Sequence, residues 1–151
     1  MKQLAHVLLT LILPAAAMAG TYDTTCGPTT FQVVAENSGH SLENKYELYG
    51  SLSKDGQRRL LFTSNIGGWL SAECVVTAKK RELLLFQAYC GGSACVEDKY
   101  GIVDPENLKL LLVPPAKNKG NSKAAAALLQ SKNVPYLPES ETAFCCQKKP
   151  Q

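Results

Sequence analysis

The sequence predicts a mainly β fold, built from antiparallel hairpins and stapled by disulfides, with one short C-terminal helix. Three observations predict it. Strand-like segments are joined in pairs by turn sequences, helical composition is confined to one segment near the C-terminus, and the 151-residue chain holds six cysteines. Consecutive hairpins of this kind are typical of a sandwich, a barrel or a propeller-like array. The sequence leaves these three architectures open.

The first hairpin is predicted from residues 46–52 and 58–63, which flank Lys54-Asp55-Gly56-Gln57. Asp-Gly between two strand-like segments is a strong hairpin signal. Its type I′ turn needs positive φ at both central residues. We therefore expect antiparallel pairing of the two segments and a positive φ at Gly56.

The second hairpin is predicted from residues 73–78 and 83–89, joined by the charged segment Lys79-Lys80-Arg81-Glu82. Its second strand contains Leu83-Leu84-Leu85-Phe86. A continuous apolar run of this length indicates a strand that is buried on both faces. We expect this strand to form the centre of the core.

The third hairpin is predicted from residues 99–103 and 108–113, which flank Asp104-Pro105-Glu106-Asn107. Pro105 would be the second residue of a four-residue turn, and the fixed φ of proline at that position suits a type I turn. Pro114 and Pro115 then end the last strand, because proline has no N–H to donate to a ladder.

One helix is predicted over residues 123–132, with Ser122 as its N-cap and Asn133 as its left-handed stop. Residues 124–130 are good helix formers. Leu128 and Leu129 are expected to supply most of the apolar area that docks on a sheet. Residues 134–138 are too rich in proline for regular structure.

The N-terminus predicts export. Lys2 precedes an apolar run over residues 7–13, and Ala17-Met18-Ala19 has the small residues of a cleavage site. We therefore expect a signal peptide at residues 1–19 and a single secreted β-rich domain at residues 20–151. The apolar run is too short to span a bilayer, and no later segment reaches the roughly twenty residues required, so no membrane partner is expected. The chain has no N-glycosylation sequon, and a bacterial periplasm fits best.

All six cysteines lie in the predicted mature chain, and an oxidising compartment favours three disulfides. Local proximity favours a bond between Cys90 and Cys95, because four small residues separate them. Bonding between the adjacent Cys145 and Cys146 would be strained, so each is expected to reach back to Cys26 or Cys74. Spacing alone does not choose among the 15 possible pairings.

Composition argues against several functional classes. Basic and acidic residues are interspersed, without the basic stripe of a nucleic-acid-binding protein. The mature chain has one histidine, His40, and no CxxC pair, so neither a metal site nor a cofactor is predicted. His40 and Ser93 form the candidate catalytic pair of a hydrolase. A cysteine nucleophile is disfavoured because an even set of cysteines is expected to be bonded, and glutamates including Glu36, Glu47 and Glu82 read as ordinary surface acids, not as a catalytic carboxylate pair.

Two connections suit contact with a partner. The first combines small polar residues, flexible glycines and the single tryptophan, an arrangement suited to entering a cleft. The second is the tip at residues 91–94, whose simplest role is to close the Cys90–Cys95 loop. The predicted partner-binding residues of the first connection are Ser64, Asn65, Ile66, Gly67, Gly68 and Trp69.

A set of short segments covers about a third of the mature chain: Leu52-Ser53-Lys54-Asp55-Gly56-Gln57-Arg58-Arg59-Leu60-Leu61-Phe62, a following loop with Ser64, then Cys74-Val75-Val76, and a terminal Phe144-Cys145 before a lysine tail. Together these segments resemble the periplasmic immunity proteins of type VI secretion amidase effectors. It implies an all-β exported protein that inserts a serine-bearing loop near the catalytic cysteine and histidine of a peptidoglycan amidase. Ser64 would be the serine of that loop.

The sequence therefore predicts a non-catalytic periplasmic immunity or inhibitor protein whose partner is a cell-wall hydrolase. A rigid sheet that presents a preorganised loop loses little conformational entropy on binding. The first alternative is a lysozyme inhibitor or another secreted binding module. The second is a small secreted hydrolase that uses His40 and Ser93.

Overall fold

The computed structural model describes residues 19–36, 45–64, 70–89, 98–116 and 119–137. Most of the predicted signal peptide, residues 1–18, lies outside this part of the chain. The described residues form eight strands and one helix: β1 (Ala19–Cys26), β2 (Thr29–Glu36), β3 (Lys45–Leu52), β4 (Arg58–Ser64), β5 (Leu70–Val76), β6 (Glu82–Ala88), β7 (Lys99–Asp104), β8 (Lys109–Leu112) and α1 (Ser122–Leu129).

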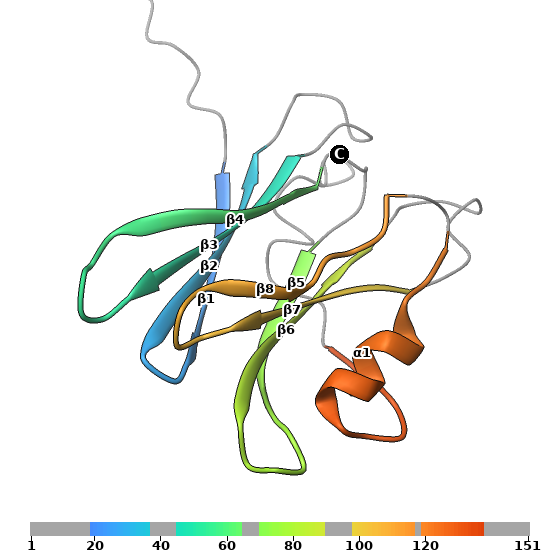
Figure 1. The fold of residues 1–151 in the computed structure, drawn as a ribbon. Coiled ribbons are helices and arrows are strands. Elements are labelled where there is room, and N and C mark those ends of the chain that lie inside the picture. Colours follow the sequence, from blue (N-terminus) through green and yellow to red (C-terminus); the bar gives the residue numbers. More distant parts are fainter. Residues whose placement is uncertain (1–18, 37–44, 65–69, 90–97, 117–118, 138–151) are drawn as a thin grey trace, which may run out of the picture.

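The strands form two antiparallel sheets, β1-β2-β3-β4 (sheet 1) and β5-β6-β7-β8 (sheet 2) (Figure 1). In each sheet the strands follow one another in chain order. Buried residues of both sheets share one core, which confirms the mainly β prediction and selects the sandwich among its three architectures. This core contains Cys26, Phe31, Val33, Ala35, Tyr46, Leu48 and Leu52 from sheet 1 and its turns, and Leu70, Ala72, Leu84, Phe86, Ala88, Val103 and Leu108 from sheet 2 and its turns.

All three predicted hairpins are confirmed, as β3–β4, β5–β6 and β7–β8. The strands β1 and β2 form a further hairpin that the sequence analysis did not assign. Gly56 has the expected positive φ, +61°. The turn is not type I′, because Asp55 is not among the residues with positive φ. Instead the Leu52 carbonyl accepts hydrogen bonds from the N–H groups of Asp55 (3.2 Å) and Gly56 (2.9 Å).

The apolar run on β6 is buried on both faces, as predicted, because sheet 2 is the middle layer of three. Leu84 and Phe86 face sheet 1 within the shared core. Leu83 and Leu85 point the other way, into a second cluster beneath α1 and the segment 134–137 (Figure 1). The remaining buried members of this cluster are Tyr100, Ile102, Ala125, Leu129 and Leu137.

The helix is shorter than predicted. It ends at Leu129, and Gln130 takes the left-handed conformation (φ +55°) that was expected at Asn133. Asn121, not Ser122, is the N-cap, and it makes no side-chain capping bond. Its amide instead accepts a hydrogen bond from the Tyr100 N–H and donates one to the Tyr100 carbonyl, both at 2.7 Å. Asn121 therefore fastens the start of the helix to β7.

Only one of the two helical leucines docks on the sheet. Leu129 is buried, whereas Leu128 is 39 % exposed. The small residues Ala125 and Ala126 complete the buried face of the helix, as their close approach to a sheet would require. Residues 134–137 have no regular structure, as predicted, and Leu137 is fully buried.

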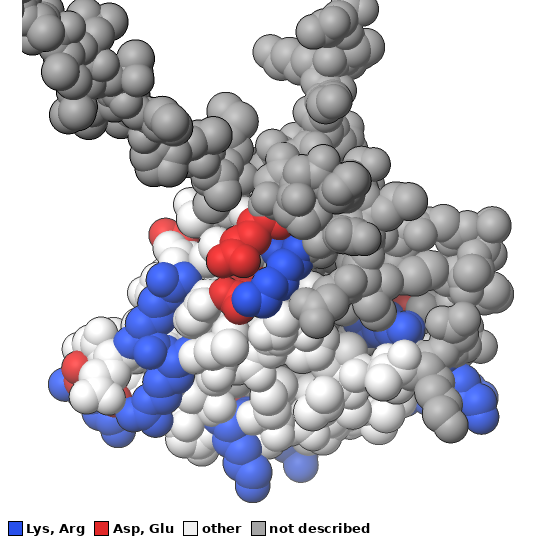
Figure 2. Space-filling view, turned by 90° about the horizontal axis from the view of Figure 1, so that it is seen from above, with Lys and Arg blue, Asp and Glu red and all other residues white. Residues whose placement is uncertain are grey.

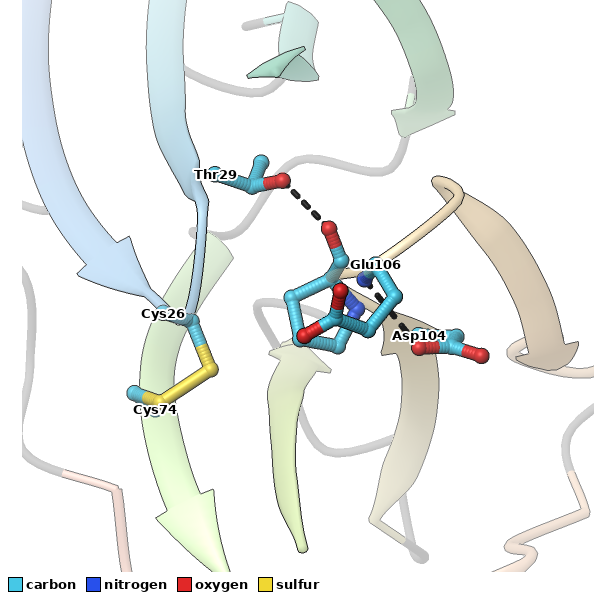
Figure 3. The surroundings of a disulfide bond; sticks show 6 residues. Cys26, Thr29, Cys74, Asp104 and Glu106 are labelled. Carbon is cyan, nitrogen blue, oxygen red and sulfur yellow. Dashed lines mark hydrogen bonds between the residues drawn. A yellow bond between two sulfur atoms is a disulfide. The ribbon is translucent and has the colours of Figure 1, made fainter. Parts of the chain in front are cut away.

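The structure corrects the predicted disulfide pairing. Cys26 at the end of β1 is bonded to Cys74 of β5, with a Cα–Cα distance of 5.1 Å (Figure 3). The prediction that Cys145 and Cys146 reach back to these two cysteines is wrong, because packing of the sheets brings β1 beside β5. Closing a loop with a sequence separation of 48 removes about 4 kcal/mol of unfolded-chain entropy. The predicted Cys90–Cys95 bond and the C-terminal cysteines lie outside the described residues.

A disulfide is compatible with an oxidising, exported compartment. Among the described residues, no helix has the length and apolar character needed to cross a membrane.

Candidate binding site at the loop-bearing end

The two ends of the sandwich differ in their connections. At one end, four tight turns follow β1, β3, β5 and β7. At the other end, β2, β4 and β6 lead into connections at residues 37–44, 65–69 and 90–97. Because the strands of each sheet are antiparallel, these three connections are attached at the same end. We call this end the loop-bearing end, and the strand residues that lie there include Glu36, Lys45, Ser64, Ala88 and Lys99. Both connections that the sequence singled out start there.

The opposite, turn-bearing end is cross-linked between the sheets. The Thr29 hydroxyl donates to the Pro105 carbonyl, next to the Cys26–Cys74 bond (Figure 3). Within sheet 2, the Arg81 guanidinium donates to the Asp104 carboxylate at 2.7 Å, which ties two neighbouring turns together. The sandwich is therefore a fixed support for the connections at its other end.

Ser64 is enclosed, in contrast to the exposed position that the resemblance implied. It is the last residue of β4, pairs with Tyr46 and is 5 % exposed. Phe62, two residues earlier, packs against Phe86 with ring centroids 5.2 Å apart. Alternation along the strand therefore places Ser64 on the inner face of sheet 1. The other predicted partner-binding residues lie outside the described residues: Asn65, Ile66, Gly67, Gly68 and Trp69.

Lys99 is a candidate residue that the sequence analysis missed. It begins β7, pairs with Ala88 and is only 5 % exposed. Val103, four residues later on the same strand, belongs to the shared core, so Lys99 also faces sheet 1. Alternation in the sequence could not identify it, because both faces of β7 are buried and the face opposite Lys99 carries the more apolar Tyr100 and Ile102.

Lys99 and Ser64 line one cavity of about 320 Å³ at the loop-bearing end. They come from opposing sheets, and both are the outermost inward-facing residues of their strands. The other residues around the cavity are Phe62, Thr63, Ala88, Pro114, Pro115 and Ala116. An ammonium and a hydroxyl thus border a largely apolar space.

A charged network lies on the outer face of sheet 1 at this end. The Lys45 ammonium lies 2.5 Å from a Glu47 carboxylate oxygen and 3.8 Å from Glu36. Glu47 is 6 % exposed, so its interpretation as an ordinary surface acid is wrong. Viewed from the loop-bearing end, acidic and basic side chains lie against one another on the surface (Figure 2).

The hydrogen bonds of this network shift the pKa values of the ionisable groups that make them. The Lys45 ammonium, and then the Tyr49 hydroxyl, donate to Glu47 and hold the pKa of this carboxyl below its usual value. The same bonds raise the pKa of Lys45 and of Tyr49. The Arg58 guanidinium lies 3.6 Å from the centre of the Tyr49 ring, a cation–π contact. The network holds side chains in place on the outer face of sheet 1, where the neighbouring residues of β2 and β3 are mostly half-buried.

A second polar cluster lies where α1 and the 134–137 segment pack on sheet 2. The Gln87 amide donates to Asp98 at 2.9 Å and accepts from the Tyr89 hydroxyl at 2.6 Å. Burial, followed by the negative charge of Asp98, raises the pKa of Tyr100 to about 12. The Tyr89 hydroxyl also donates to the Leu137 carbonyl at 3.4 Å, and the Asp98 carbonyl accepts from the Asn121 N–H at 3.3 Å. Because the cluster thus docks α1 and the 134–137 segment, we assign it a structural role.

The described residues do not assemble a catalytic or metal-binding set from the sequence candidates. His40 and Ser93 lie outside them. Within the described part of the chain, Cys26, Cys74 and Glu82 place possible metal-ligand atoms within 4.8 Å of one another. Both sulfur atoms are committed to the disulfide, so neither is a thiolate ligand.

The chain matches no protein-family model, no curated protein and no solved structure.

Proposed function

We propose that the protein is an exported binding protein of the inhibitor type, which uses its loop-bearing end to occlude the active site of a peptidoglycan amidase. The observation that carries the proposal is the gathering of three connections at one end of a sandwich whose other end is closed by cross-linked turns. The target class rests on the resemblance to amidase immunity proteins. The periplasm is the proposed compartment.

The rigid support explains how such an end would bind tightly. Both strands that carry the 65–69 connection are held in sheets, and their last described residues, Ser64 and Leu70, are buried. A connection with fixed ends loses less conformational entropy when a partner orders it. Ser64 anchors the connection, and most of the contact with the partner falls to residues 65–69.

The proposal is tested by titrating a cysteine–histidine amidase, encoded beside this protein in its own organism, with the wild type and two variants. Gly67→Arg adds a bulky charge to the loop-bearing end and should weaken inhibition by several kcal/mol, as expected at an interface centre. Gln57→Arg adds the same side chain to an exposed turn at the opposite end. It should inhibit like the wild type.

Circular dichroism checks that both variants are folded. Equal inhibition by Gly67→Arg and the wild type would place the interface elsewhere. If the wild type does not inhibit the amidase but inhibits lysozyme, the protein is instead a lysozyme inhibitor. Inhibition of neither enzyme would reject the proposed function.

A further inference from the structure

The cavity at the loop-bearing end combines a buried positive charge with an apolar wall. Lys99 is 5 % exposed, although lysine is almost never fully buried unless it is paired. Among the described residues, no carboxylate lies within 4 Å of its ammonium. Removing an ammonium from water without a compensating partner costs free energy. A negatively charged group entering this cavity would supply that partner.

Ser64 adds a hydroxyl on the opposite side of the same space. Ser64 is also 5 % exposed, and its Oγ makes no hydrogen bond to another residue of the described ranges. A hydroxyl donates one hydrogen bond, and an ammonium donates up to three. A carboxylate accepts several such bonds, so its two oxygens suit a site that offers donors from two sheets.

The other residues that line the cavity indicate which chemical group the carboxylate is attached to. Phe62, Ala88, Pro114 and Pro115 present apolar surface to the cavity. Its 320 Å³ corresponds to roughly ten water molecules at about 30 Å³ each. This space suits a short aliphatic group, and the apolar surroundings strengthen an ion pair formed inside it.

We propose that this cavity binds a carboxylate on a short aliphatic group, with Lys99 as the counter-charge and Ser64 as a hydrogen-bond donor. The carboxylate belongs either to a small free ligand or to an acidic side chain of a bound protein. The inference concerns the cavity itself and holds whether or not the target is an amidase.

The probe is butyrate, with butyramide as an uncharged control of similar shape. Both are titrated into the isotope-labelled, disulfide-bonded protein while NMR signals of the Lys99 side chain and of Ala88 are followed. Butyrate should shift these signals saturably, and butyramide should not. Lys99→Met should weaken butyrate binding by about tenfold or more, as the loss of a charge-assisted hydrogen bond predicts. Lys99→Arg should retain most of the binding.

Lys109→Met is the matched control, because Lys109 is exposed on the neighbouring strand β8. It should leave butyrate binding unchanged. Thermal unfolding gives a second readout. In the absence of ligand, Lys99→Met should be at least as stable as the wild type, because it removes a buried charge.

Two results would overturn the proposal. One is a lack of saturable butyrate shifts in the wild type. The other is marked destabilisation by Lys99→Met without ligand, which would show that a carboxylate of the chain itself already pairs with Lys99. If butyrate binds, the amidase titration separates the sources: weakened inhibition by Lys99→Met identifies an acidic side chain of the partner, and unchanged inhibition identifies a small free ligand.

Discussion

Replacing Gly101 by alanine should destabilise the protein through a single contact. Gly101 pairs with Phe86 across the central strands of sheet 2. A Cβ added to Gly101 would lie 2.0 Å from Cζ of the Phe86 ring and 2.3 and 2.6 Å from its two Cε atoms. Real Cβ atoms essentially never approach other heavy atoms so closely, so the ring must move.

The ring has little room to move. Phe86 is fully buried, and it also packs against Phe62 from the opposing sheet. Inserting a methyl group into a closely packed core costs about 1–3 kcal/mol when the neighbours adjust. Because the neighbour here is a buried ring held on its other side, we expect a loss of about 3 kcal/mol. That loss corresponds to a shift of the urea midpoint on the order of 1–2 M.

The assay is urea unfolding of four proteins: the wild type, Gly101→Ala, Phe86→Leu and the double variant. Leucine has no ring to cover residue 101, so Gly101→Ala should cost less in the Phe86→Leu background than in the wild type. The difference between the two costs is the coupling energy of the pair. A cost below about 0.5 kcal/mol for Gly101→Ala, or equal costs in both backgrounds, would refute the packing argument.

Three further predictions concern a turn and two titratable groups. Gly56 has a φ of +61°, and no atom lies within 4 Å of a Cβ added there, so backbone strain alone should set the cost of a substitution. Gly56→Val should lower the free energy of unfolding by about 1–3 kcal/mol, and Gly56→Asn by less. An unchanged denaturation midpoint for the valine variant would contradict this. The lowered pKa of Glu47 stabilises the fold at pH values above the unfolded pKa of about 4.3, and this stability is lost as the pH falls. Glu47→Gln should therefore lose less free energy of unfolding than the wild type as the pH is lowered. Parallel plots of unfolding free energy against pH for the two proteins would count against this. The raised pKa of Tyr100 contributes its full stabilisation below pH 10, and this contribution is lost between pH 10 and about 12. Ultraviolet titration should show one phenol that ionises near pH 12 in the wild type and is missing in Tyr100→Phe. If the wild type shows no such phenol, the argument from burial is contradicted.

Local sequence signals predicted the hairpins well, because turn residues and strand alternation act over a few residues. The positive φ of Gly56 and the two-sided burial of the run at residues 83–86 are examples. The type I′ assignment failed because the strands are joined by a longer turn than Asp55-Gly56 alone requires. The threonines of β1 and the threonines and valines of β2 favour strands, but no strong hairpin sequence such as Asp-Gly joins them.

Features that depend on packing between distant segments could not be predicted locally. Cys26 pairs with Cys74 only because sheet stacking places β1 beside β5. The Asn121 side chain hydrogen-bonds the Tyr100 backbone and therefore does not cap the helix. This exchange of partners depends on where α1 docks on the sheet. The cavity has the same origin, since Ser64 and Lys99 are 35 positions apart in sequence and meet only when the two sheets pack.

In the proposed function, the loop-bearing end binds the partner and the turn-bearing end does not. Amide hydrogen exchange of the protein, alone and in complex with the proposed amidase partner, tests this most directly. We predict slower exchange on binding in residues 62–70 and 88–99, and unchanged exchange in the turns at residues 53–57 and 77–81. Protection of those turns, with no change in residues 62–70 and 88–99, would contradict it.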